Sequence, residues 1–259
     1  MNLHVFNNAF RTGRIGLIWY FVAALIGVAA GGAGLSTLQG ASGAAITEVI
    51  KQLPPPLLAA FKINLSSFTS PVGYIAARSL SLFVPLILIA FAAGNAGGIS
   101  QFIERGTIHF ELSLPLARWR WLLSRIAAGA LGLLCIIVVA TLALHVFAPA
   151  EWWRYSVYGF AFGLLWLGIA YAIAAFSKER SAVTTLVFGF FGVQYLLSII
   201  ASINADTRPI ENLSLWSAYQ PETVMLTGLP WGTVLGWCAI GLLGFVVALW
   251  QWQRRDLPA

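Results

Sequence analysis

Charged side chains are scarce in this chain, yet six of them gather in one stretch near its middle. Asp, Glu, Lys and Arg make up 9% of the 259 residues. The stretch Ile103–Arg125 reads IERGTIHFELSLPLARWRWLLSR and contains two glutamates, four arginines and a histidine. Such groups could act in general acid–base catalysis, or they could bind a protein partner. The residue types therefore pose a choice between an active site and a docking surface.

Motifs for catalysis by this chain are absent from the sequence. The three histidines, His4, His109 and His145, have no metal-ligand spacing, and neither H-E-x-x-H, G-x-S-x-G nor an aspartate-rich pair occurs. The chain also lacks the G-x-x-x-x-G-K-[ST] loop that cradles nucleotide phosphates, so any ATP that drives it must bind to a partner. Cys135 and Cys238 lie within apolar runs, where we expect small core residues. We therefore expect a non-catalytic protein.

The composition is that of a membrane protein. Hydrophobic residues make up 59% of the chain and the mean hydropathy is +0.82, whereas a soluble domain has roughly 25% charged residues. A helix needs about 20 apolar residues to cross roughly 30 Å of hydrocarbon. The apolar runs are continuous rather than alternating, which argues against a barrel. We expect six transmembrane helices at about Ile15–Gly34, Ser79–Gly98, Leu122–Phe147, Tyr155–Phe176, Ser181–Ile203 and Pro230–Trp250.

The predicted fold class is thus an all-α integral membrane protein with a single transmembrane domain over residues 1–259. The first apolar run exceeds the length of a signal-peptide core, and five more runs follow it. We therefore expect this run to be retained as a span rather than cleaved.

Basic residues predict the orientation. With the N-terminus inside, the inner segments hold ten Lys and Arg and four acidic residues, whereas the outer segments hold five of each. The whole formal charge of +6 then falls on the inner side, as expected because cytoplasmic loops are enriched in Lys and Arg. We expect a multi-pass protein of the inner (plasma) membrane with both termini in the cytoplasm. The basic residues form no long patch with stacking aromatics, so no nucleic-acid partner is expected.

The first residues have a pattern of their own. Residues 1–14 place Leu3, Phe6 and Phe10 near one helical face. This spacing predicts a short amphipathic helix that lies on the inner membrane surface, and a frayed polar terminus is the alternative.

Two outer segments are long. The segment over residues 34–78 contains the triple proline Pro54–Pro56, which must end any helix that precedes it. The segment over residues 204–229 is divided into short pieces by its prolines. Its carboxylates could attract a cationic substrate, although solvated loop charges are the simpler interpretation. They are Asp206, Glu211 and Glu222.

Few polar side chains fall at mid-membrane depth, where secondary transporters usually place ionisable groups. Asn95, Gln194 and Tyr195 are candidates for lining a substrate pathway, and interhelical hydrogen bonding is the alternative. Small residues recur within the spans and are expected to let helices pack closely. They include Gly27, Gly31, Gly34, Gly94, Gly98, Gly129 and Gly132.

The inner segment over residues 99–121 contains more than membrane anchors. Arg118, Arg120 and Arg125 lie where basic anchors are expected. The two glutamates, the Gly-Thr pair and the Ser-Leu-Pro turn are not explained in this way. A protein partner explains them better than topology does.

These residues resemble the membrane subunits of type-two ATP-binding-cassette (ABC) exporters. After the second span that family commonly has a Glu, a Gly-Thr or Lys-Thr pair, an acidic position, an LLS-x-P turn, an arginine and a more distant basic residue. One branch also has an LP-x-x-LL-x-AF run followed by F-x-SP-x-G-aromatic in the first outer segment. The matching inner residues are Glu104, Gly106, Thr107, Glu111, Leu112, Ser113, Pro115, Arg118 and Arg125, and the matching outer residues are Leu53, Pro54, Leu57, Leu58, Ala60, Phe61, Phe68, Ser70, Pro71, Gly73 and Tyr74.

Two positions depart from the family pattern. The spacing from Glu104 to Gly106 is shorter than in many relatives, and the basic Arg78 stands where relatives more often have an acidic residue. Both departures bear on the exact register of the match.

The resemblance implies an ATP-driven exporter. Two such subunits, identical or related, would form the substrate pathway and pair with two separate ATPase subunits that bind ATP and Mg²⁺. A coupling helix between the second and third spans would insert into a groove on the ATPase, and the SKER loop at Ser177–Arg180 would make a second contact. The implied coupling residues are Glu104, Gly106, Thr107, Glu111, Pro115, Arg118, Lys178 and Arg180.

Two other classes of protein fit the sequence less well. An intramembrane enzyme would need the catalytic constellation that the sequence lacks, and a scaffold without transport would not account for the two motifs. The apolar, uncharged spans favour an amphipathic or hydrophobic cargo, with membrane lipids as neighbours.

Overall fold

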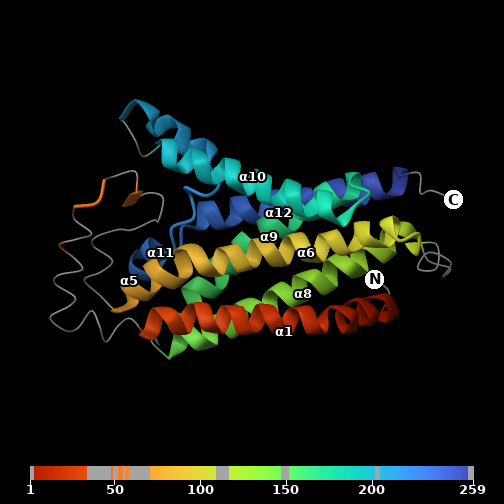
Figure 1. The fold of residues 1–259 in the computed structure, drawn as a ribbon, viewed down its shortest axis with the longest axis horizontal. Helices are drawn as coiled ribbons and strands as arrows, with labels where there is room; N and C mark the ends of the chain where they lie inside the picture. The colour runs from red at the N-terminus through yellow and green to blue at the C-terminus, as the bar shows by residue number, and fades with distance from the viewer. Residues whose placement is uncertain are drawn as a thin grey trace.

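The protein is an elongated bundle of long helices that run along its length (Figure 1). The computed structural model describes residues 3–33, 48, 52–54, 57–58, 71–108, 117–146, 152–201 and 205–255. Within these ranges there is no strand, so the predicted all-helical class is confirmed. The helices are α1 (Leu3–Ala33), α5 (Pro71–Ile75), the π-helix η2 (Ala76–Phe83), α6 (Val84–Glu104), α8 (Arg118–His145), α9 (Trp152–Phe176), α10 (Arg180–Ala201), the 3-10 helix η3 (Ala205–Leu213), α11 (Pro221–Thr227) and α12 (Trp231–Arg254).

Six helical stretches are long and apolar enough to cross a membrane, as the sequence predicts. Each overlaps one predicted span, and the boundaries differ by a few residues except in the second span. The stretches are Gly13–Ala33, Gly73–Glu104, Arg118–His145, Trp152–Phe176, Arg180–Ala201 and Trp231–Arg254.

The first helix is continuous. α1 runs from Leu3 to Ala33, so the residues predicted as a separate interface helix extend the first span instead of lying apart from it. The reason is local, because these residues contain no proline and Gly13 does not have the positive φ that would end a helix. Leu3 is 71% exposed, whereas Phe10 packs against the core.

The second span is longer than predicted. Helical structure begins at Pro71 and continues through η2 into α6, whereas the predicted span begins at Ser79. The charged Arg78 marks no boundary, because it is exposed and its Nη1 donates a hydrogen bond to the Tyr74 hydroxyl at 3.2 Å. At 1.5 Å per residue the 32-residue span is about 48 Å long. Its ends must therefore project beyond roughly 30 Å of hydrocarbon.

α9 lies at the centre of the bundle, where it packs against α12, α6 and α8. Its buried aromatic residues include Phe162, Trp166 and Tyr171. α9 and α12 cross at small residues, because a Cβ on Gly168 would meet the backbone of Gly241. Such close backbone approach is typical of membrane helices.

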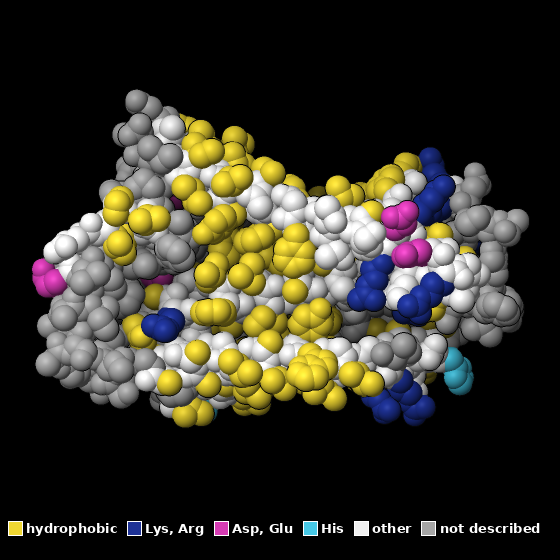
Figure 2. Space-filling view, in the orientation of Figure 1, with side chains coloured by type: hydrophobic (Ala, Val, Ile, Leu, Met, Phe, Trp, Pro, Cys, Tyr) yellow, Lys and Arg dark blue, Asp and Glu magenta, His cyan; other side chains and the backbone are white. Residues whose placement is uncertain are grey.

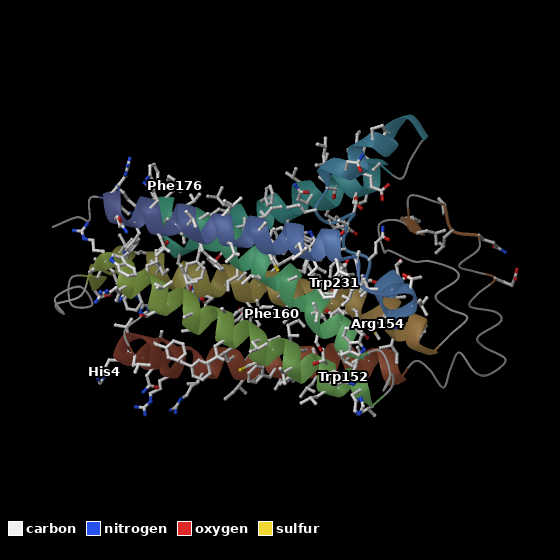
Figure 3. The ribbon with its side chains drawn as sticks, turned by 180° about the vertical axis from the view of Figure 1, so that it is seen from behind. His4, Trp152, Arg154, Phe160, Phe176 and Trp231 are labelled. Atoms are coloured by element: carbon white, nitrogen blue, oxygen red, sulfur yellow. The ribbon has the colours of Figure 1, made fainter. Side chains whose placement is uncertain are left out.

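The two ends of the bundle differ. The first turn of α1, the last turn of α12, the end of α6 and the start of α10 all lie at one end (Figure 1). From behind, His4 and Phe176 mark this end, and Trp152, Arg154 and Trp231 mark the other, where α11 lies (Figure 3). The chain therefore has both termini of its helical bundle on one side, as the predicted topology requires.

Candidate functional site

Charged residues gather at the end of the bundle where α6 ends and α10 begins. We call this region the charged end and define it as residues 101–108, 117–120, 177–180 and 254–255. Figure 2 shows Lys, Arg, Asp and Glu side chains at this end, whereas hydrophobic side chains cover most of the middle of the visible face. The charged end is thus the part of the described surface best suited to bind a polar partner.

The Gly-Thr pair ends α6. Gly106 has a φ of +67°, in the left-handed region that glycine adopts without strain. Its N–H donates to the Ile103 carbonyl at 3.1 Å, and the Thr107 N–H donates to the Phe102 carbonyl at 3.0 Å. These two bonds form a Schellman motif, which satisfies carbonyls at a helix C-terminus. The pair therefore fixes where the chain leaves α6, directly after Glu104.

Glu104 connects α6 to α10. Its Oε2 accepts a hydrogen bond from the Arg180 backbone N–H at 3.1 Å, at the first residue of α10. Arg180 also donates through Nη1 to Gln101 Oε1 at 3.1 Å. A carboxylate at a helix N-terminus is favourable because it meets unpaired N–H groups and the positive end of the helix dipole.

A surface groove of about 530 Å³ lies beside this contact. α6 and α10 supply its walls, so its shape depends on how the two helices sit relative to each other. Its lining residues are Gln101, Glu104, Arg105, Arg180, Ser181, Thr184 and Thr185.

Arg255 closes the end of α9. Its guanidinium donates to the carbonyl oxygens of Ala174, Ala175 and Ser177 at 3.3, 2.9 and 2.9 Å. A cation at this position complements the negative end of the helix dipole. Burial lowers the pKa of Arg255, but an arginine remains charged at neutral pH. The Arg255 carbonyl in turn accepts a hydrogen bond from Arg118 Nη1 at 3.0 Å, which connects α12 to α8.

The structure brings only some of the predicted coupling residues together. Glu104 and Arg180 are in direct contact, whereas Arg118 meets the end of α12 and Lys178 is exposed on the loop before α10. Glu111 and Pro115 lie outside the described residues. The coupling helix itself therefore stays a prediction.

A half-open cavity of about 300 Å³ lies deeper in the bundle and is lined by residues of α1, α6, α8, α9 and α10. Asn95, predicted to line a pathway, borders it and accepts a hydrogen bond from the Tyr171 hydroxyl at 2.7 Å. Arg125 also borders it, with its guanidinium carbon 4.4 Å from the Phe102 ring centroid. The sequence predicts Arg125 as a surface anchor, and the structure adds these contacts within the bundle. Arg125 lies two turns into α8, where its half-buried side chain packs against Phe102 of α6.

The other two pathway candidates hold neighbouring segments. Gln194 Oε1 accepts a hydrogen bond from the Leu215 N–H at 2.8 Å, a backbone group of the turn that follows η3 and not of another helix. The Tyr195 ring packs against Phe191 and Trp216. Both residues stabilise the chain that follows η3 against α10.

Glu222 is buried, which corrects its interpretation as a solvated loop charge. It is 6% exposed, and its Oε1 accepts a hydrogen bond from the Ser81 hydroxyl at 3.2 Å. The reason is tertiary, because α11 folds back against η2. Nearby, the Tyr219 hydroxyl donates to the Leu80 carbonyl at 2.7 Å, and burial raises its pKa well above the ordinary value. Glu211, in contrast, is exposed as expected.

Sequence reasoning missed Gln101, Arg255 and the inward position of Arg125. Arg255 has the same sequence signal as any basic residue after a span, and Gln101 is a single amide near a helix end. Among the described residues, no three His, Cys, Asp or Glu side chains come together to bind a metal ion. The chemistry of the charged end is that of hydrogen bonding and charge recognition.

Comparison with known proteins identifies the family. No curated protein matches the chain. The family model described as "ABC-2 family transporter protein" matches residues 9–257, a range that includes all six spans, the charged end and the half-open cavity. The chain therefore belongs to the ABC-2 family of membrane transporter proteins.

Proposed function

We propose that this chain is the permease subunit of an ATP-driven exporter. Two six-span subunits, identical or related, form the substrate pathway, and two separate ATPase subunits dock on the charged end. The observation that carries the docking assignment is the contact of Glu104 with the first N–H of α10, beside a groove formed by α6 and α10. A partner seated there touches two spans at once.

The contacts of the charged end suit the transmission of force. Hydrogen bonds connect α6 to α10 through Glu104 and Gln101, α9 to α12 through Arg255, and α12 to α8 through Arg118. A displacement of this end by ATP-driven closure of the ATPase pair therefore reaches several spans together. Hydrolysis itself takes place on the partner, since the chain has no phosphate-binding loop.

The exposed apolar helices support the pairing of two subunits. α10 exposes large hydrophobic side chains along much of its length, including Leu186, Val193 and Leu196. In a membrane, lipid covers part of this surface and a second subunit covers the rest. The positive-inside rule places the charged end in the cytoplasm.

A pull-down tests the docking assignment. Full-length chain is purified from native membranes, and co-purifying ATPases are identified by their phosphate-binding loop. Glu104→Lys reverses a charge at the groove, whereas Glu211→Lys makes the same change on η3 at the opposite end. We expect wild type and Glu211→Lys to recover the ATPase and Glu104→Lys to recover several-fold less. A Pro115 deletion is expected to weaken pairing in the same way. Normal recovery of the ATPase by both Glu104→Lys and the Pro115 deletion would contradict the docking site.

A further inference from the structure

The half-open cavity has more polar lining residues than the rest of the spans. It lies within the membrane half that belongs to the charged end, because Arg125 is about 10 Å along α8 from Arg118 and Asn95 is about 14 Å along α6 from Glu104. Its polar lining residues come from five different helices. They are Tyr20, Asn95, Gln101, Arg125, Tyr171 and Arg180.

The charges that border the cavity have one sign. Arg125 and Arg180 both line it, and the described lining residues include no carboxylate. An arginine at this depth is costly and usually marks a functional site. Arg125 is held in place by its contacts with the Phe102 and Trp121 rings, whose centroids are 4.4 and 5.1 Å from the guanidinium carbon. This arrangement favours an anion.

Glycines keep the cavity open. Gly13 and Gly16 of α1 and Gly94 and Gly98 of α6 all border it. A Cβ added to Gly13, Gly16 or Gly98 would meet no atom within 4 Å. These positions therefore leave open space at the border of the cavity, which larger residues there would occupy.

An apolar surface adjoins the polar groups. Leu17 of α1 and Phe91 and Phe102 of α6 line the cavity beside these polar groups. A ligand with an anionic head and an apolar chain would match both parts. The volume of about 300 Å³ falls at the lower end of the range for small-molecule sites and fits a headgroup.

We propose that this cavity binds the anionic headgroup of an amphiphile, such as a phosphate monoester, with the apolar chain against α1 and α6. Arg125 contacts the headgroup, and Asn95, Gln101 and Tyr20 supply the polar surroundings. This proposal adds a ligand class to the proposed function. It rests on the proposed function only for the identification of the amphiphile as cargo. It also gives the cavity a connection to the docking surface, because Gln101 and Arg180 line both the cavity and the surface groove.

Gln101 and Arg180 are also joined to each other by a hydrogen bond of 3.1 Å. A partner that moves Arg180 would move a residue of the ligand site as well. Binding of the amphiphile and docking at the groove therefore share one contact.

Binding of radiolabelled dodecyl phosphate to the purified full chain in a neutral maltoside detergent tests the proposal without ATP or an ATPase. Dodecyltrimethylammonium has the same tail with a cationic head, and inorganic phosphate has the head without the tail. We expect unlabelled dodecyl phosphate to compete and the other two not to compete at the same concentration. Equal competition by the cation would overturn the charge assignment. Equal competition by inorganic phosphate would identify a free-phosphate site and overturn the amphiphile.

Two variants locate the site. Arg125→Gln removes the charge, and Gly98→Leu fills the space while it leaves every charge in place. We expect each to weaken binding by about tenfold or more, because a charge-assisted contact or the room for it is lost. The matched controls are Arg120→Gln and Gly189→Leu, and both should bind dodecyl phosphate as wild type does. Arg120 is an exposed arginine of the same helix. Gly189 is an exposed glycine of α10 at which an added Cβ meets no atom within 4 Å.

Wild-type affinity in both Arg125→Gln and Gly98→Leu would refute this site. Because these measurements omit the ATPase, that result would leave the docking surface untouched, and failure of the pull-down would likewise leave the ligand site untouched.

Discussion

Gly106 determines where α6 ends. Its positive φ lets α6 stop and lets the Gly106 and Thr107 N–H groups bond back to the helix. The family resemblance implies that the Gly-Thr pair contacts a partner, whereas the structure also gives the pair a role in folding. The two roles are compatible, because a fixed helix end presents Glu104 in one direction.

Substitution of Gly106 tests this role. We expect Gly106→Val to lower the free energy of unfolding by about 1–2 kcal/mol, because a β-branched residue is strained at positive φ. Gly106→Asn should lower the free energy of unfolding clearly less, since asparagine tolerates the left-handed region. Thermal unfolding in detergent measures both effects, because each kcal/mol lowers the melting temperature by about 2–4 °C. Equal melting temperatures for the two variants would show that the turn is not held in this conformation.

Single residues were also where sequence reasoning was weakest. The sequence places Arg118, Arg120 and Arg125 in one anchoring group, yet Arg125 borders the cavity and Arg118 contacts the end of α12, since the direction of a side chain depends on the helices packed around it. Glu222 similarly looks like a loop carboxylate until α11 folds back onto η2. Charge and position along the chain cannot reveal such tertiary contacts.

Elements were predicted better, because the length of an apolar run is a direct consequence of bilayer thickness. All six spans lie where uncharged runs predict them. The errors concern continuity, since α1 includes the residues expected to form a separate helix and the second span starts at Pro71. Both arise from treating an arginine as the end of a span, although a long side chain at the rim can keep its charge in water.

Helix packing gives a prediction at this scale. Several glycines expected to allow close packing do so, for example Gly129 against Asn95 and Gly132 against Phe91. The closest approach involves Gly168, where an added Cβ would meet the α12 backbone at Gly241. Backbone cannot move aside as a flexible side chain can, so we expect Gly168→Ala to destabilise the protein by about 1–3 kcal/mol.

Gly236→Ala is the matched control, because a Cβ at that position of α12 meets no atom within 4 Å. Alanine is favoured over glycine within a helix, so its melting temperature should equal or exceed that of wild type. A melting temperature of Gly168→Ala that is as high as that of Gly236→Ala would contradict the packing of α9 on α12.

Topology is a property of the whole molecule, and its two ends can be labelled separately. After Cys135 and Cys238 are replaced by alanine, single cysteines are placed at the exposed Arg11 and Thr227. We expect a membrane-impermeant maleimide to label Thr227→Cys in intact cells and Arg11→Cys only after permeabilisation, since basic residues favour the cytoplasm. The reverse pattern would place the charged end outside and would exclude docking by a cytoplasmic ATPase.

The whole molecule is a transporter of the ABC-2 family whose spans converge at the charged end. Hydrogen bonds at this end link α6, α8, α9, α10 and α12, so a partner bound there can act on these five helices together. The cavity that we assign to an anionic amphiphile lies directly behind the groove. On this account docking and ligand binding are coupled through Gln101 and Arg180.

ATP hydrolysis by the partner ATPase, reconstituted with this chain in lipid vesicles, tests the coupling most directly. We expect the wild-type chain and Glu211→Lys to stimulate hydrolysis to the same extent, and Glu104→Lys to lose most of the stimulation, because the reversed charge disrupts the joint between α6 and α10. Undiminished stimulation by Glu104→Lys, in a chain that also pairs normally with the ATPase, would contradict the account.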